Sequence, residues 1–219
     1  GDTTVVTNKW MLGTRNSFFI GICATLLATA LGTVAALGLS RRNMPFKGTI
    51  MAILISPMIV PLIITSAGMF FFYSKIGLTH TYLGLILAHT ALGTPFVVIT
   101  VTATLTGFDT NLIRASQSLG ADTMRTFFKV IMPLILPGVI SGGLFAFITS
   151  FDEVVVVMFV GSVEQITIPK QMWAGLRQET SPVILCMATC LVALSIGLLT
   201  TVEMLRRRSE RLRGIKLHK

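Results

Sequence analysis

The chain has 219 residues, of which 53% are hydrophobic and only 12% are charged. A mean hydropathy of +0.79 excludes a soluble globular domain, so we expect an integral membrane protein. The net charge of +9 does not indicate nucleic-acid binding, because the basic residues gather at the ends of apolar runs, as they do beside membrane spans.

The chain opens with a polar segment, residues 1–16, that is too short and too polar to cross a membrane. Five apolar runs follow, and each exceeds the roughly 20 residues that a helix needs to cross about 30 Å of hydrocarbon. They are continuously apolar rather than alternating, which predicts helices and not a barrel. We therefore expect an all-α bundle of five transmembrane helices in one domain, 1–219, with spans at about 17–39, 49–73, 82–106, 134–160 and 182–205.

The first span carries small residues at helical spacing, which predicts close contact with neighbouring helices. They are Gly21, Ala24, Ala28, Gly32 and Ala36. The second span contains Pro57 and Pro61, each of which removes a helical hydrogen bond. Two interpretations stay open: a broken helix that lines a transport path, or a plain kink filled by neighbouring side chains. His89 in the third span is a pathway residue or, as we favour, one satisfied by a neighbouring helix.

Between the third and fourth spans lies a polar segment of different character, the coupling loop 107–133. Asp109 is placed to cap a helix with apolar positions through Leu119, and Gly120 stands where that helix would end in a left-handed residue. Asp122 is placed to cap a second helix that Pro133 closes. Two short helices joined by a glycine hinge indicate a docking device rather than a catalytic one.

The fourth span ends with the only adjacent acidic pair, Asp152 and Glu153. Asp152 lies 18 residues after Leu134, about 27 Å along a helix and so in the outer part of the membrane core. Such carboxylates need water, a cation or a hydrogen-bonding partner. They either face the transport path and bind a cationic amine, or form a helix-end pair that contacts the backbone of the loop 161–182.

The distribution of basic residues predicts the orientation. Three connections carry 13 of the 18 Lys and Arg: residues 41–47, the coupling loop, and the tail from Arg206 onward. The positive-inside rule then places these connections and the C-terminus in the cytoplasm, with residues 1–16 outside. The basic tail is suited to anionic lipid head groups. In the outer loop, Trp173 is expected at the membrane interface.

No motif of a common enzyme class is present, so we expect no catalytic residues, no cofactor and no metal. There is no phosphate-binding Gly-x4-Gly-Lys-Ser/Thr loop, no Gly-x-Ser-x-Gly and no His-Glu-x2-His. The three cysteines lie in apolar spans and lack partners at metal-ligand spacing. The chain is therefore not expected to hydrolyse ATP itself.

The coupling loop resembles the signature of ATP-binding-cassette importer permeases, Glu-Ala-Ala, three residues, Gly, nine residues, Ile, two residues, Pro. The matching positions are Arg114, Ala115, Ser116, Gly120, Val130 and Pro133. Arg114 stands where the family has Glu, so the polar contact made there differs. A generic amphipathic loop is the alternative. The resemblance implies that these residues, with Asp109 and Leu119, couple the permease to an ATPase.

Over residues 17–205 the chain resembles the spermidine/putrescine type of these permeases, through PFVVITV at 95–101, SFDEVVVVMFV at 150–160 and the TSPV segment. The resemblance implies a bacterial inner-membrane pore subunit with two cytoplasmic ATP-binding subunits, a second homologous permease and a periplasmic substrate-binding protein that touches the outer loops. It also implies a sixth span before Gly1, and a polyamine as the solute. The alternatives are a permease for another small solute, a secondary transporter driven by an ion gradient, or a purely structural subunit.

Overall fold

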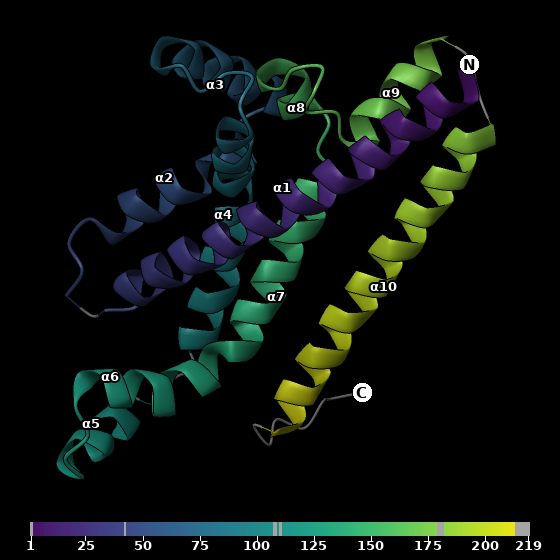
Figure 1. The fold of residues 1–219 in the computed structure, drawn as a ribbon. Helices are drawn as coiled ribbons and strands as arrows, with labels where there is room; N and C mark the ends of the chain where they lie inside the picture. The colour runs from purple at the N-terminus through teal and green to yellow at the C-terminus, as the bar shows by residue number, and fades with distance from the viewer. Residues whose placement is uncertain (1, 42, 107–108, 110, 179–181, 213–219) are drawn as a thin grey trace.

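The structure is a computed structural model that describes residues 2–41, 43–106, 109, 111–178 and 182–212. The described residues form helices joined by turns, and none of them lies in a strand, which confirms the predicted all-α class (Figure 1). The helices are α1 (Asp2–Leu39), α2 (Lys47–Ile59), α3 (Leu62–Ile76), α4 (Tyr82–Thr106), α5 (Asn111–Ser118), α6 (Thr123–Thr126), the π-helix η1 (Phe127–Ile131), α7 (Met132–Phe151), α8 (Val155–Val160), α9 (Ile168–Gln178) and α10 (Pro182–Leu212).

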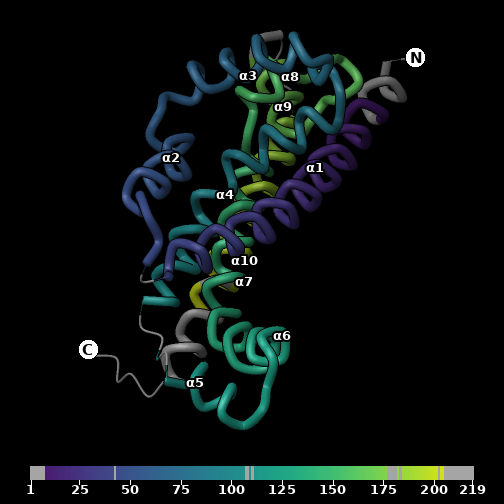
Figure 2. Tube along the Cα trace, turned by 90° about the vertical axis from the view of Figure 1, so that its left-hand side faces the viewer, coloured from purple at the N-terminus to yellow at the C-terminus, as the bar shows by residue number. Residues whose placement is uncertain are grey.

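Helix α4 is the centre of the bundle and packs against both α1 and α7 (Figures 1 and 2). In the 18-residue apolar stretch of α4, 61% of the residues are buried. The corresponding share is 33% in α1 and in the helix that ends in α7, and 6% in α10. Helix α10 therefore lies at the edge of the bundle and exposes most of its apolar surface. Four helices among the described residues are long and apolar enough to cross a membrane, or five if the bent pair α2–α3 counts as one span.

Five of the six threonines of α4 satisfy their hydroxyl groups within the helix, whereas the buried Thr102 hydroxyl has no hydrogen-bond partner among the described residues. The hydroxyls of Thr90, Thr94, Thr100 and Thr104 each donate to the carbonyl four residues earlier, at 2.7–2.9 Å. Because lipid offers no hydrogen-bond partner, such local bonds avoid the cost of an unpaired polar group.

Glycines set the close approach of α1 and α7 to α4. A Cβ atom added to Gly32 would lie 2.6 Å from Val97 Cβ, and one added to Gly142 would lie 2.7 Å from Val97 Cα. One turn earlier on the same side of α4, a Cβ at Gly93 would lie 2.9 Å from Ala146 Cβ of α7. The close contact predicted for the small residues of α1 is confirmed at Gly32, and Ala24, Ala28 and Ala36 are at most 1% exposed.

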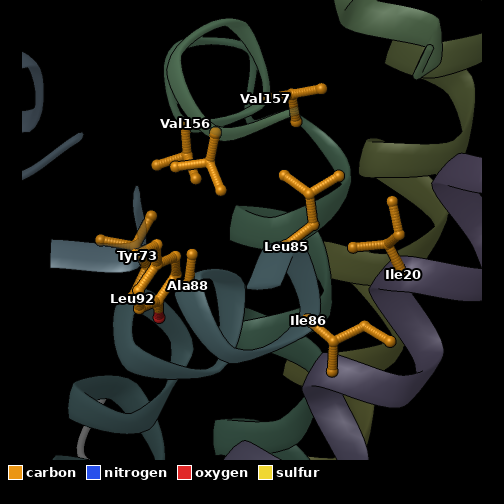
Figure 3. Close-up of a cluster of buried hydrophobic side chains, with 9 residues drawn as sticks. Ile20, Tyr73, Leu85, Ile86, Ala88, Leu92, Val156 and Val157 are labelled. Carbon is orange, nitrogen blue, oxygen red and sulfur yellow. The ribbon is translucent and has the colours of Figure 1, made fainter. Parts of the chain in front are cut away.

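An apolar cluster joins α8 to the end of the bundle that lies opposite α5 and α6 (Figures 1 and 3). Val156 and Val157 of α8 pack with Leu85 of α4, Ile20 of α1 and Tyr73 of α3. This cluster lies far from α5 and α6 and holds α1, α3, α4 and α8 together.

The second predicted span, 49–73, is not a straight helix: α2 and α3 meet at an angle of 103°. Pro57 stays inside α2, whereas the break falls at Val60, whose ψ of 137° is extended. The residue before a proline is pushed out of the helical region, so Pro61 sets the place of the bend. The helix is therefore broken, with Pro61 rather than Pro57 at the bend, and its place beside a transport path stays a prediction.

The boundaries of two other spans also differ from the sequence prediction. Within the fourth, 134–160, the helix stops at Phe151, and α8 begins only at Val155 after a short non-helical link. At the start of the chain, the segment expected to be a polar flank is helical from Asp2 and continues into the first span as α1. Polar residues that do not reach the membrane core can still extend a helix begun there, because each added residue gains a hydrogen bond.

The glycine contacts predict that Gly32→Ala destabilises the bundle while Gly38→Ala, on the same helix, does not. A methyl group at position 32 collides with Val97, whereas none of the described atoms lies within 4 Å of a Cβ at position 38. Overpacking of this kind costs about 1–3 kcal/mol. Thermal unfolding of the purified variants in detergent should show a lower midpoint for Gly32→Ala alone. Equal midpoints for the two variants would contradict this packing.

Candidate functional site

The coupling loop forms a compact helical unit at one end of α7, which we call the 109–131 unit. Asp109 Oδ1 accepts a hydrogen bond from the Asn111 backbone N–H at 2.9 Å, and Asp122 Oδ1 accepts one from the Arg125 N–H at 2.7 Å. Gly120 has a φ of +81°. The predicted N-terminal caps and the predicted left-handed glycine are all confirmed, and they set the angle between α5 and the helix that follows.

The second helix of this unit does not stop at Pro133, contrary to the sequence prediction. Helical structure runs without interruption from Thr123 to Phe151 through the π-helix η1. In η1 the Met132 N–H donates to the Phe127 carbonyl, five residues back. A proline ring crowds the carbonyl four residues before it, and the wider π turn relieves this crowding without ending the helix. The unit is thereby joined directly to α7.

The inner face of α5 is tied to the second helix and to the bundle. Ser116 Oγ lies 3.0 Å from Thr126 Oγ1, and Thr126 is only 2% exposed. Ile113 and Gln117, on the same face, line a cavity of about 440 Å³ between the unit and the ends of α1 and α4. Ser116, expected at a partner contact, is therefore placed inside the unit.

The outer face of the unit is apolar and exposed. Leu112 is 44% exposed, Phe128 59%, Met124 65% and Leu119 88%. Ala115 is exposed on the same side of α5 as Leu112 and Leu119, and Arg114 is exposed on another side of that helix. A patch of large apolar side chains on a helical unit that projects beyond the ends of α1 and α4 (Figure 1) is typical of a protein contact.

At the opposite end of α7, the two acidic residues have different surroundings. Asp152 is exposed and follows the last residue of α7. Glu153 is 8% exposed, and its Oε1 accepts a hydrogen bond from the Val156 N–H at 3.0 Å, which caps α8. Glu153 thus follows the helix-end interpretation, but its contact is with α8 and not with the loop 161–182. Asp152 and Glu153 lie beyond the end of α7 rather than within a helix.

Three residues that the sequence did not single out fix the outer loop to the bundle. Asn16 Nδ2 donates to the carbonyls of Glu164 and Ile166, at 3.0 and 2.9 Å, and Tyr82 donates to Asn16 Oδ1 at 3.1 Å. Gln165 Nε2 donates to the His80 carbonyl at 2.9 Å. Asn16 ends the polar flank in the sequence, where one more amide gives no signal of a long-range contact.

The outer loop also surrounds a cavity of about 500 Å³, lined by His80, Ser162 and Lys170 among others. Lys170, in α9, donates to the carbonyls of Val157 and Ser162. Burial lowers the pKa of this ammonium group, and the two carbonyls that accept its hydrogen bonds hold it in place. Trp173, on the same helix, is 44% exposed, as expected of a side chain at a membrane interface.

His89 is fully buried between α4 and α7. Its Nδ1 lies 2.7 Å from Ser150 Oγ, so a neighbouring helix satisfies this nitrogen as the favoured interpretation expects, whereas the buried Nε2 has no hydrogen-bond partner among the described residues. Within the described part of the chain, no group of three His, Cys, Asp or Glu side chains is arranged to hold a metal ion.

With this geometry in place, comparison with known proteins identifies the family. The family described as "Binding-protein-dependent transport system inner membrane component" matches residues 28–211. The chain belongs to this family. It is therefore a transporter subunit of the inner membrane, and the resemblance predicted from the coupling loop is confirmed.

The curated relatives include polyamine permeases. The spermidine/putrescine transport system permease protein PotC of Haemophilus influenzae is 30% identical over 194 residues, which cover 89% of this chain and 76% of that protein. The putrescine transport system permease protein PotI of Escherichia coli K12 is 29% identical over 212 residues, covering 91% and 74%.

Solved structures show the same fold. A chain of the inward-facing MetNI methionine ABC transporter superposes with a TM-score of 0.73 at 19% identity, over 93% of this chain and 97% of that one. A chain of an amino acid ABC transporter gives 0.68 at 15% identity, over 94% and 96%. At these identities the likeness concerns the fold alone.

The bonds of Asn16 predict that Asn16→Ala loosens the outer loop. Two part-buried hydrogen bonds, to the carbonyls of Glu164 and Ile166, are lost at a cost of about 0.5–1.5 kcal/mol each, and the link to Tyr82 is lost as well. Cleavage after Glu164 by a glutamate-specific protease should become faster. Asn8→Ala, at an exposed position of the same helix, is the control and should leave the rate unchanged. Equal cleavage rates for the two variants would show that Asn16 does not hold the loop.

Proposed function

We propose that the chain is a pore-forming permease subunit of an ATP-driven importer that carries a polyamine across the bacterial inner membrane. Relatives named as spermidine/putrescine and putrescine permeases support this solute. The importer fold supports the transport mechanism. The proposed complex contains two ATP-binding subunits, a second homologous permease and a periplasmic substrate-binding protein, with membrane lipids around the spans.

The exposed apolar patch on the 109–131 unit is the observation that carries this proposal. In this account Leu119, Ala115 and Arg114 touch the ATPase on the cytoplasmic side, and the bulk of the basic residues and the C-terminus lie on that side too. Asp109 and Gly120 hold α5 at its angle, Ser116 ties α5 to the second helix through Thr126, and the helix through Pro133 passes movement to α7. Purely structural membrane subunits have no need of such a unit.

At the other end, we place Asp152 and Glu153 at the outer part of the solute path. A polyamine carries several positive charges, and a carboxylate in a low-dielectric setting pairs with an ammonium group more strongly than it would in water. The exposed Asp152 is the contact for the amine, and Glu153 positions α8 beside it through the Val156 bond. The bend at Pro61, with Pro57 one turn before it, leaves backbone beside the same path.

The proposal is tested by uptake into proteoliposomes that contain the complete complex. Radiolabelled putrescine and spermidine should accumulate only when ATP and the substrate-binding protein are present. Accumulation driven by a proton or sodium gradient without ATP would support a secondary transporter instead. ATP-dependent uptake of another small solute, with no polyamine uptake, would keep the mechanism and overturn the cargo.

Gly120 gives a sharp prediction for the unit. Gly120→Val should reduce ATP-driven uptake strongly, because a β-branched residue disfavours φ +81° by about 1–2 kcal/mol. A Cβ meets no described atom within 4 Å there, so the effect is conformational and not steric. Gly120→Asn is the matched control, since asparagine tolerates the left-handed region and should retain most uptake. Normal uptake by the Val variant, at equal membrane level, would argue against a fixed left-handed hinge.

The acidic pair gives a second prediction. Asp152→Asn should raise the KM for polyamine uptake at least several-fold, because it removes the exposed charge and keeps the size. Glu153→Gln keeps an oxygen that accepts from Val156 N–H, so it should preserve folding and change KM less. Uptake measured over a range of putrescine concentrations distinguishes the two variants. Wild-type KM in both would remove the carboxylates from the path.

A further inference from the structure

The cavity of about 440 Å³ on the inner side of the 109–131 unit lies at a membrane boundary. Leu37 and Leu105, in the last turns of α1 and α4, line it from the bundle, and Ile113 and Phe127 line it from the unit (Figure 1). Helices α1 and α4 are long and apolar enough to cross a membrane, so their last turns mark the edge of the hydrocarbon. The cavity therefore lies where lipid head groups meet acyl chains, and its volume is within the range of small-molecule pockets, about 300–1,000 Å³.

Three polar side chains that line this cavity have no partner in the protein. They are Arg41, just after α1, Gln117 on α5 and Thr123 at the start of α6. None of the three side chains forms a hydrogen bond or an ion pair with another described residue. By contrast, the hydroxyl groups of Ser40 and Thr126, which also line the cavity, have partners already. A guanidinium group, an amide and a hydroxyl group are thus left to donate to a ligand.

The charge around the cavity is positive. Arg41 lines it, and Arg114 is exposed three residues before Gln117, on the same side of α5. No carboxylate is among the described residues that line the cavity. The two acidic residues of the unit, Asp109 and Asp122, instead accept hydrogen bonds at the starts of α5 and α6. A cationic ligand such as a polyamine is therefore disfavoured here, and an anion is favoured.

We propose that this cavity binds the phosphate group of an anionic phospholipid. Arginine pairs with two phosphate oxygens at once, so Arg41 is the main contact, and Gln117 and Thr123 donate to the same group. The acyl chains begin against Leu37 and Leu105. Basic pockets beside membrane spans are suited to such head groups. A lipid held there joins the end of α1 to α5 and so steadies the unit against the bundle. This role is separate from the solute path.

Inorganic phosphate and nucleotides carry the same chemical group as the lipid. The apolar part of the cavity favours the lipid, because acyl chains gain from leaving water against Leu37, Leu105 and Ile113, whereas a small hydrated anion does not. The position at the ends of two spans favours it as well, since a lipid reaches the cavity without leaving the membrane.

The test uses the complete transporter in vesicles of phosphatidylethanolamine with a minor share of phosphatidylglycerol, without nucleotide. A photo-crosslinking amino acid replaces Ile113, and mass spectrometry identifies the lipids attached to it. Phosphatidylglycerol should be enriched in the adducts at least about fivefold over its share in the vesicle. Arg41→Gln should reduce the adducts to about the composition of the vesicle. Arg41 is exposed and lies just after α1, so this replacement leaves the packing of the bundle intact.

Lys47→Gln is the matched control. Lys47 is also exposed and basic and begins α2, outside the cavity, so its replacement should keep the enrichment. Adducts with the composition of the vesicle in the wild type, no lipid adduct, or enrichment that survives Arg41→Gln would overturn the proposal. Loss of the adduct on adding inorganic phosphate or ADP, but not sodium chloride of equal ionic strength, would assign the site to a soluble phosphate and overturn the lipid. No uptake is measured, so the result does not depend on the proposed function.

Discussion

The rest of the structure depends on one unbroken helix that begins at the Asp122 cap and ends at Phe151. It includes Pro133 and Pro137, either of which would end or kink an ordinary helix. The π turn at 127–131 absorbs the first of them. As a result, residues 123–131 of the unit are not a hinged appendage but continue into α7, and α5 is joined to this helix through the Gly120 turn.

Close packing carries a displacement of α7 further. Gly142 of α7 and Gly32 of α1 both bring their helices close against Val97 of α4, so a shift of one of these helices is felt by the other two. Interiors packed in this way shift between discrete arrangements instead of deforming gradually. At the far end, α7 is followed by Asp152 and by Glu153, whose side chain caps α8. Helix α8 in turn packs on α3, the second helix of the bent pair. The helix therefore links the proposed ATPase contact to the proposed solute path.

The sequence was informative wherever a local rule decides the structure. The caps at Asp109 and Asp122 and the left-handed Gly120 follow from side-chain chemistry within a few residues, and the structure has all three. Apolar runs were enough to predict the spans, because lipid enforces helices. The family resemblance was found from the spacing around Gly120.

Where neighbours compete with a local rule, the sequence was less reliable. Pro133 reads as a helix end, yet a π turn accommodates it. The uncharged run from Val154 predicts the last part of the fourth span, but Glu153 caps a separate helix, α8, that begins at Val155. The contact of Asn16 with residues about 150 positions away depends on the tertiary fold, so no periodicity reveals it.

The central claim is that residues 123–131 of the unit and α7 move as one rod. Spin labels at Met124 and Ile148, 24 residues apart, should show one narrow distance of at most about 36 Å at helical rise. In the complete transporter, that distance should be the same without nucleotide and with ATP trapped, while the distance from Met124 to the partner permease changes. A Met124–Ile148 distance that shifts or broadens with ATP would show a hinge within the helix and contradict this account.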